Sequence, residues 1–283
     1  MIVVTGASGQ LGRLVIAALL QKVPAGEIVA AVRNPAKVAD LAARGVQVRQ
    51  ADYDQPASLV AAFKGADKLL LISASEVGRR VPQHRAVIDA AKAAGVGLLA
   101  YTSILHADTS PLPLAAEHQE TEALIRASGL PAVILRNSWY TENYLAGIPA
   151  ALQYGVLLGS AGAGRIASAA RADYAEAAAA VLTTDDQAGR IYELAGDESY
   201  TLAELAGEIT QQSGKAVAYQ DLPESEFKAA LLGAGLPEAL ATLLAESDAG
   251  AAKGGLFDDG RQLSQLIGRP TTPLSKLVGQ ALG

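Results

Sequence analysis

The stretch Ile2-Val3-Val4-Thr5-Gly6-Ala7-Ser8-Gly9-Gln10-Leu11-Gly12 decides the fold of the chain. Three β-forming residues lead into glycines spaced G-x-x-G-x-x-G, and apolar residues then recur at helical spacing. A strand, a glycine turn and a helix N-terminus in this order present free backbone N–H groups and the positive end of a helix dipole to an anion. We therefore expect the turn to hold the phosphates of a nucleotide through Gly6, Ala7, Ser8, Gly9, Gln10, Leu11 and Gly12.

The spacing of these glycines narrows the kind of site. It differs from the commoner G-x-G-x-x-G motif, and it is not a P-loop, because Arg13 follows Gly12 and no Gly-Lys-Ser/Thr is present. Three glycines alone are a weak signal, and their place between a strand and a helix strengthens it. A glycine turn that binds no nucleotide is the alternative.

Composition sets limits on the function. The chain has 283 residues, a formal net charge of −6 and no cysteine, and half of its residues are hydrophobic. The charge argues against nucleic acid as a partner, and the absence of cysteine excludes disulfides and thiolate metal sites. The three histidines, His84, His106 and His118, form no metal-type pair.

No apolar run reaches the roughly 18 to 20 residues of a membrane span, and no secretory signal precedes the first strand. We therefore expect a cytoplasmic location.

Strand and helix patterns alternate through residue 136. Further strands are predicted at 28–32, 46–50, 67–72, 98–101 and 133–135, with helices at 35–44, 56–64, 80–94 and 117–127. Their near-continuous apolar runs are typical of strands buried on both faces. Repeated β-α units of this kind predict an α/β fold with a Rossmann-type, doubly wound parallel sheet.

The pattern changes after residue 140. Helices are predicted at 141–154, 202–213, 224–232, 237–246 and 274–282, with a glycine-rich stretch at 155–164 and a short strand at 216–220. An alanine-rich helix starting near Asp173 and a strand at 190–194 return to the earlier pattern. We expect residues 1–140 with 170–196 to form the nucleotide-binding domain. Residues 141–169 with 197–283 then form a smaller, mostly helical C-terminal lobe on the substrate side.

Arg33 follows the second predicted strand and indicates the kind of dinucleotide. An NAD site carries an acid for the ribose hydroxyl about 20 residues past the glycines. Here the tip of the strand reads Val32-Arg33-Asn34-Pro35 and holds a guanidinium instead. A fixed cation suits a 2′-phosphate, so NADPH is favoured over NADH. A solvated arginine that ends a strand is the alternative.

The other strand ends supply the remaining candidates, because ligands of doubly wound sheets bind beyond the carboxyl ends of the strands. Asp52 could accept from the adenine amino group or cap the next helix, and the small residues 73–75 would let a dinucleotide pass close to backbone. Arg79 and Arg80 are interpreted as a solvated helix start. The predicted cofactor contacts beyond the glycine turn are Arg33, Asp52, Tyr53, Ser73, Ala74, Ser75, Thr102, Ser103, Asn137, Trp139 and Tyr140.

Four segments taken in order resemble a known family. They are residues 5–12, 32–35, Tyr101-Thr102-Ser103 and Leu135-Arg136-Asn137, and they are similar to the NmrA-like group of atypical short-chain dehydrogenases. Within that group the chain looks most like the bacterial NADPH:quinone oxidoreductases, nearly from end to end, and triphenylmethane-dye reductases look almost as close. The resemblance implies an NADPH-dependent, flavin-free reductase.

The chain departs from the wider family at its proton relay. Most short-chain dehydrogenases carry a Tyr-x-x-x-Lys pair, whereas Leu114 and His118 stand at those places here. Oxidation of secondary alcohols through that relay is therefore disfavoured. A quinone or a dye cation can accept hydride without prior protonation, so that catalysis rests on holding the two rings together. We take His118, Tyr101 and Asn143 as candidates for the chemistry. A contact of His118 to the ribose or a helix cap, and a core position for Tyr101, are the alternatives.

The segment from Asn137 to Tyr144 holds the single tryptophan of the chain. Its aromatic and amide groups would form a stacking slot for a flat ring, with Phe227 and Phe257 on the other side. Ordinary core packing of Trp139 is the alternative. The sequence thus favours a reductase of quinones. Reduction of dyes or other conjugated electrophiles, and a non-catalytic NADP-binding redox sensor of the NmrA type, stay open, as does a homodimer.

Overall fold

The computed structural model describes residues 1–283, the whole printed sequence. Its main sheet has seven strands in the order β3-β2-β1-β4-β5-β6-β8. Their bounds are β1 Ile2–Val4, β2 Ile28–Val32, β3 Gln47–Gln50, β4 Lys68–Leu71, β5 Leu98–Ile104, β6 Ala132–Asn137 and β8 Ile191–Leu194. The pairings from β3 to β6 are all parallel. From β1 the chain adds β2 and β3 on one side of the sheet and then β4, β5 and β6 on the other. The predicted doubly wound sheet is therefore confirmed.

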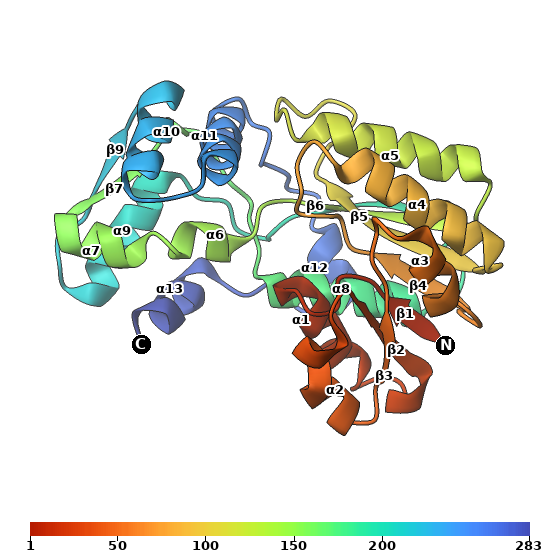
Figure 1. Ribbon diagram of the computed structural model, residues 1–283. Helices are drawn as coiled ribbons and strands as arrows, with labels where there is room; N and C mark the ends of the chain where they lie inside the picture. The colour runs from red at the N-terminus through yellow and green to blue at the C-terminus, as the bar shows by residue number, and fades with distance from the viewer. The chain divides into compact units, whose positions relative to one another are not determined.

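Helices cover both faces of this sheet (Figure 1). The helices and 3-10 turns of this part are α1 Gln10–Leu19, η1 Ala25–Glu27, η2 Pro35–Val38, α2 Ala39–Ala43, α3 Pro56–Ala62, α4 Arg80–Ala93, α5 Ala115–Ser128 and α8 Arg171–Thr183. On the face covered by α3, α4 and α5, one core cluster joins Leu71 and Tyr101 of the sheet to Phe63, Val87 and Ile125. Helix α1 packs against α8 on the opposite face.

The chain divides into two compact units. The first comprises Met1–Ile104, Ala116–Asn137 and Arg171–Tyr192, and the second comprises Leu105–Ala115, Ser138–Ala170 and Glu193–Gly283. The second unit includes residues 138–140, 170, 193–196 and 105–115, which the expected division assigned to the nucleotide-binding domain. For 105–115 the reason is a tertiary contact, since Leu112 packs so closely on Gly250 and Gly255 that a Cβ at either glycine would meet it within 2.7 Å.

The second unit is mostly helical, as we expected, and it also contains two short strands. Its elements are α6 Thr141–Leu145, α7 Ile148–Tyr154, β7 Val156–Gly159, α9 Leu202–Ser213, β9 Ala218–Asp221, α10 Glu224–Gly233, α11 Glu238–Ala252, α12 Gln262–Ile267 and α13 Leu274–Leu282. Strands β7 and β9 form a parallel pair, α10 packs on α11, and α9 packs on α13 (Figure 1). None of the helices in the chain combines the length and the apolar character needed to span a bilayer.

Three element predictions need correction. The single helix expected at 141–154 is two helices, because α7 starts afresh with Pro149 in its first turn. The glycine-rich stretch contains β7, which buries alternate residues, Leu157 and Gly159. Strand β5 runs three residues beyond its predicted end, and Ser103 and Ile104 pair with Arg136 and Asn137 of β6. Thr102 and Ser103 therefore lie inside a strand and not beyond it.

Candidate active site at the carboxyl edge of the sheet

The glycine turn after β1 has the geometry of an anion cradle. Gly6 adopts a left-handed conformation with a φ of 59°, and the N–H of Gly9 donates to the carbonyl of Gly6 at 2.9 Å. A Cβ on Gly12 would lie 2.5 Å from the oxygen of Gly6, so no side chain fits between the helix and the turn. The first N–H groups of α1 have no partner within the helix. The cradle therefore fits a pyrophosphate group.

The hydroxyl of Thr5 joins β1, β3 and β4 just below this turn. It donates to the carbonyl of Leu70 at 3.0 Å and accepts from the N–H of Ile72 at 3.1 Å. The hydroxyl of Tyr53 lies 2.5 Å from the Thr5 oxygen and 3.0 Å from the carbonyl oxygen of Ile72. Burial raises the pKa of Tyr53 well above its ordinary value. The Tyr53 hydroxyl, a predicted cofactor contact, is thus used to hold three strand ends together.

Arg33 ends β2 and is exposed, but it has a carboxylate neighbour. Its Nη1 lies 3.2 Å from Oε1 of Glu76, and 70% of its side chain is accessible. The other oxygen of Glu76 lies 3.1 Å from Nη1 of Arg79. The guanidinium of Arg33 keeps further N–H donors on its exposed side, as a 2′-phosphate contact requires.

Asp52 makes a local turn, close to the capping role that the sequence left open. Its Oδ1 accepts from the N–H of Asp54 at 3.1 Å, and its Oδ2 accepts from the amide of Gln55 at 3.2 Å. Its own N–H donates to the hydroxyl of Ser58 at 2.9 Å. These bonds fix the entry to α3 and engage both oxygens of the carboxylate.

The loop between β4 and α4 is tied down by side chains. The N–H of Ser73 donates to Oγ1 of Thr102, and the N–H of Ala74 donates to Nε2 of His84, each at 2.9 Å. Arg80 is 7% exposed, and its Nε donates to the carbonyl of Ala74 at 2.5 Å. The interpretation of Arg80 as part of a solvated helix start is therefore wrong. At residues 73–75, where we expected a dinucleotide to pass close to the backbone, the N–H groups of Ser73 and Ala74 are already bonded within the protein.

Tyr101 and His118 form a buried pair between β5 and α5. The Tyr101 hydroxyl lies 2.7 Å from Nδ1 of His118, and the two residues are 0% and 4% exposed. Burial, then Arg80 and His84, lower the pKa of His118 to about 3. His118 is therefore neutral near pH 7, and it does not provide an imidazolium proton. Tyr101 lies in the core cluster, the alternative that the sequence left open.

Ser103 faces a buried ion pair. Glu122 of α5 accepts from Arg136 of β6 through both oxygens, at 3.0 and 2.7 Å. The hydroxyl of Ser103 donates to Oε1 of Glu122 at 2.6 Å. Ser103, a predicted cofactor contact, and Arg136 of the resembling segment 135–137 thus both bind Glu122 between the sheet and α5.

Asn137 is the last residue of β6, and its side-chain oxygen, unlike the side chains of Ser103 and Arg136, has no hydrogen-bond partner. The residue is 6% exposed, and its Oδ1 is buried without a hydrogen-bond partner in the structure. A buried amide oxygen of this kind costs free energy unless a donor reaches it. The predicted role of Asn137 as a cofactor contact fits this vacant acceptor.

The predicted contacts Trp139, Tyr140 and Asn143 belong to the second unit. Trp139 is 8% exposed, Tyr140 is the N-cap of α6, and Asn143 lies within that helix. Phe227 is buried and Phe257 is exposed. The stacking slot and the role of Asn143 in the chemistry stay predictions.

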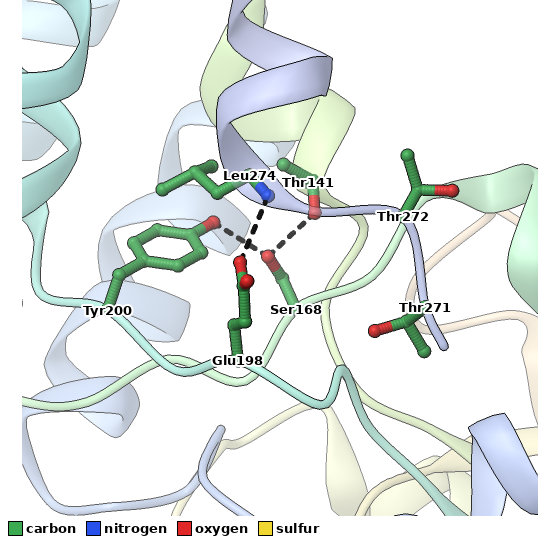
Figure 2. Close-up of a pocket in the computed structure, with 7 residues that line it drawn as sticks. All are labelled: Thr141, Ser168, Glu198, Tyr200, Thr271, Thr272 and Leu274. Carbon is green, nitrogen blue, oxygen red and sulfur yellow. Dashed lines mark hydrogen bonds between the residues drawn. The ribbon is translucent and has the colours of Figure 1, made fainter. Parts of the chain in front are cut away.

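Figure 2 shows a small polar pocket that also lies within the second unit. Its lining residues are Thr141, Ser168, Glu198, Tyr200, Thr271, Thr272 and Leu274. The hydroxyl of Ser168 lies 2.6 Å from that of Tyr200 and 2.8 Å from that of Thr141. No histidine or carboxylate bonds Ser168, and burial raises the pKa of Tyr200 to about 12. The pocket lacks the base that a serine nucleophile needs, so we assign these hydroxyls to structure.

Sequence reasoning missed His84, Arg80 and Glu122 as parts of this edge. One signal was available, because Arg80 and His84 share the helical spacing of the buried residues Val87, Ile88 and Ala91 in α4. Glu122 and Arg136 carry no such mark, since their pairing joins a helix to a strand and follows the periodicity of neither element. No group of three or more histidines and carboxylates is arranged to hold a metal ion.

A glycine cradle, an exposed cation after β2 and a buried amide oxygen without a hydrogen-bond partner at the end of β6 together define a dinucleotide-binding protein. The sequence model of the NAD(P)H-binding family matches residues 6–185, and the chain belongs to this family. The chain is 61% identical over 278 residues to quinone oxidoreductase 2 of Escherichia coli (strain K12), and the match covers 98% of this chain and 97% of that protein.

Two solved structures are similar over nearly the whole chain. The crystal structure of an NADPH-dependent quinone oxidoreductase from Escherichia coli, complexed with NADPH, matches with a TM-score of 0.98 and 60% identity over 100% of both chains. The Citrobacter sp. triphenylmethane reductase, complexed with NADP(H), matches with a TM-score of 0.96 and 42% identity, covering 99% of this chain and 100% of that one. The predicted kinship with NADPH-dependent reductases is confirmed.

Proposed function

We propose that the chain is an NADPH-dependent quinone oxidoreductase. The observation that carries the proposal is the 61% identity to quinone oxidoreductase 2 of Escherichia coli over 98% of this chain. The fold agrees, since the chain matches an NADPH complex of such an enzyme with a TM-score of 0.98.

The residues of the carboxyl edge fit this cofactor. The glycine turn and the first N–H groups of α1 would hold the pyrophosphate, Arg33 would hold the 2′-phosphate, and Oδ1 of Asn137 would accept a donor from the nicotinamide half. NADPH supplies the hydride when it is bound. The bonds that tie down residues 73 and 74 keep the edge rigid, so the protein orients the two reacting rings.

Proton supply follows from the neutral state of His118. The pKa of His118 is lowered to about 3, first by burial, so the ring is not an acid near pH 7. A hydroquinone oxyanion is a weak base, with a pKa near the ~10 of a phenol. Water can supply that proton without a Tyr-x-x-x-Lys relay.

Stopped-flow mixing of the protein with NADPH and a simple benzoquinone tests the proposal. We expect the absorbance of NADPH to fall in proportion to the quinone added. Binding of NADPH without turnover on any quinone would contradict the proposal and favour the sensor. As a control for the cofactor, Arg33→Asp should weaken NADPH far more than NADH, and equal losses would exclude Arg33 as the 2′-phosphate contact.

A second acceptor class has a specific observation in its favour. The chain is 42% identical to the Citrobacter sp. triphenylmethane reductase over 99% of its length. Such dyes are flat, conjugated electrophiles and need no prior protonation either. We expect kcat/KM for a triphenylmethane dye to be below that for benzoquinone, and the reverse order would make the dye class the better description.

The oligomeric state and the location complete the proposal. A homodimer would appear as twice the chain mass in light scattering after size-exclusion chromatography. A cytoplasmic location would appear as recovery of the protein in the cytosolic fraction of the source cells. We propose both, with a small molecule and not a nucleic acid as the partner.

A further inference from the structure

Four charged side chains of alternating sign lie in the loops that follow β2, β3 and β4. In order of contact they are Arg33, Glu76, Arg79 and Asp54, and all belong to the first unit. Their formal charges cancel, and Glu76 supplies the one ion pair that Arg33 makes within the protein. The cation that we assign to a phosphate is therefore compensated by a carboxylate of the chain itself.

Arg33 lies next to the glycine turn. Strands β1 and β2 are parallel neighbours, and beyond their paired residues the N–H of Ala7 donates to the carbonyl of Ala31 at 3.3 Å. Arg33 follows Ala31 by two residues, and its side chain is mostly exposed. A dinucleotide with its pyrophosphate on the turn therefore places its adenosine ribose close to the end of β2, where NADPH and NADH differ.

The carboxylate of Glu76 is held in place by two further donors. Its Oε2 accepts from Nη1 of Arg79 at 3.1 Å and from Nε2 of Gln83 at 3.2 Å, while its Oε1 lies 3.2 Å from Nη1 of Arg33. Gln83 is buried, and Glu76 is half-buried. Both oxygens of this carboxylate are therefore engaged, and one of them is directed at Arg33.

The backbone on both sides of Glu76 is also anchored. The N–H of Ala74 donates to Nε2 of His84 at 2.9 Å, and the N–H of Gly78 donates to Oε1 of Glu117 at 3.0 Å. These bonds attach the loop to α4 and α5. They limit how far Glu76 can withdraw from Arg33 when an anion approaches the guanidinium.

A 2′-phosphate at Arg33 would meet a like charge. A phosphate monoester carries about −1.5 to −2 charges near pH 7, and the carboxylate of Glu76 contacts the same guanidinium. Repulsion between the two anions weakens binding, to an extent that solvent moderates at an exposed site. NADH has an uncharged hydroxyl in that position and does not encounter this repulsion.

We propose that Glu76 is a specificity-determining residue whose carboxylate opposes the 2′-phosphate at Arg33 and thereby limits the preference for NADPH over NADH. Arg79 and Gln83 are positioning residues that hold the carboxylate beside Arg33. The inference rests on the part of the proposed function that assigns the 2′-phosphate to Arg33, and it does not depend on the reduction of quinones.

Glu76→Gln tests the proposal, because it removes the charge and keeps an amide oxygen that can accept from Arg33. The Kd values of NADPH and NADH are measured by calorimetric titration in the absence of quinone. We expect the Kd of NADPH to fall about fivefold and that of NADH to change by less than about twofold. The gain should shrink in about 0.5 M sodium chloride, which screens exposed charges. An unchanged or higher Kd of NADPH would overturn the proposal.

Two further variants separate the charge beside Arg33 from other causes. Asp89→Asn removes the same formal charge at an exposed position of α4 and should change the Kd of NADPH by less than about twofold. Glu76→Asp keeps the charge on a shorter side chain, so the ratio of the two Kd values should stay nearer to that of the wild type. A gain in either variant equal to that in Glu76→Gln would overturn the proposal.

The titrations also distinguish this inference from the proposed function. A fivefold gain in Glu76→Gln together with no turnover on any quinone would contradict quinone reduction and support the role of Glu76. Retention of the wild-type preference for NADPH in Arg33→Asp would remove the phosphate from Arg33. That result would overturn the inference, whereas turnover on benzoquinone in the wild-type protein would still support the proposed function.

Discussion

The glycine turn after β1 and the polar interior between β5 and α5 lie at the same edge of one sheet, and they are built in opposite ways. In the turn, Gly6 and Gly12 matter because they lack side chains, and the first N–H groups of α1 have no partner within the helix. In the interior, Ser103, Glu122 and Arg136 bind one another. The difference teaches that ligand contacts here come mainly from groups that the fold leaves open, whereas most polar side chains of the edge maintain its shape.

The largest effect expected is at the interior ion pair. Glu122→Ala removes the carboxylate that binds Arg136 through two hydrogen bonds. Breaking such a buried pair should lower the free energy of unfolding by roughly 3–5 kcal/mol, measured by urea denaturation. Glu120→Ala, at an exposed position of the same helix, should change it by less than about 0.5 kcal/mol. An equally small loss of stability in Glu122→Ala would mean that the buried ion pair does not stabilise this edge of the sheet.

A carboxyl group in the second unit extends the comparison, because it is buried without a cation. Asp248 is 4% exposed and accepts from the Tyr144 hydroxyl and the N–H of Ser160, each at 3.0 Å. Burial raises the pKa of Asp248 from 3.8 to about 6. The folded state therefore binds this proton more tightly, and its ionisation destabilises the fold as the pH rises through about 6.

Asp248→Asn should remove this penalty. Relative to the wild type, the variant should gain stability that is absent below pH 3.8, grows between pH 3.8 and about 6 and is complete above that value. The gain is on the order of 3 kcal/mol, from 1.36 kcal/mol per pKa unit. Urea denaturation at pH 4 and pH 8 checks it. A difference between the proteins that does not vary with pH would show that Asp248 ionises without penalty.

The glycine turn should be sensitive to a single methyl group. In Gly12→Ala the new Cβ would lie 2.5 Å from the oxygen of Gly6, which should cost roughly 1–3 kcal/mol of stability. Titration with NADPH should show binding at least about tenfold weaker, because the N–H groups of the cradle shift. Gly207→Ala is the matched control in helix α9, where a Cβ meets nothing within 4 Å. Equal behaviour of the two variants would contradict the close packing.

The smallest change in stability is expected at the hydroxyl of Tyr53, just below the glycine turn. Tyr53→Phe removes its contacts with Thr5 and Ile72 and should cost about 1 kcal/mol of stability. Calorimetric unfolding would measure this change, with Tyr154→Phe at an exposed position as the control. A loss of NADPH binding greater than the loss of stability would reassign Tyr53 to the cofactor.

The same contrast explains what the sequence could predict. The turn with Gly6, Gly9 and Gly12 could be predicted without knowing its neighbours in the fold, because a strand, a turn and a helix are local sequence patterns. The doubly wound sheet follows from the repetition of such patterns. Ser103, Thr102 and Tyr53 were assigned to the cofactor from their place at strand ends. Their bonds to Glu122, Ser73 and Thr5 depend on tertiary neighbours that no local pattern contains.

Element boundaries failed for related reasons. The end of β5 is set by its pairing with β6 and not by its own residues. Strand β7 is four residues long and is defined by its partner β9, which lies about 60 residues further along the chain. Helix α12 has six residues, too few for an amphipathic period to be evident. Residues 105–115 fall in the second compact unit, and the close packing of Leu112 on Gly250 and Gly255 there is a tertiary property.

The packing of α1 on α8 has a consequence for synthesis of the chain. Helix α1 ends at Leu19, but α8 begins at Arg171, so the cradle helix emerges from the ribosome long before the surface that covers it. Until then the apolar face of α1, with Val15, Ile16 and Leu19, lacks its native cover. Contacts of such sequence separation slow folding and leave nascent chains prone to association. The packing of α1 in the first unit is therefore complete only after α8 has been made.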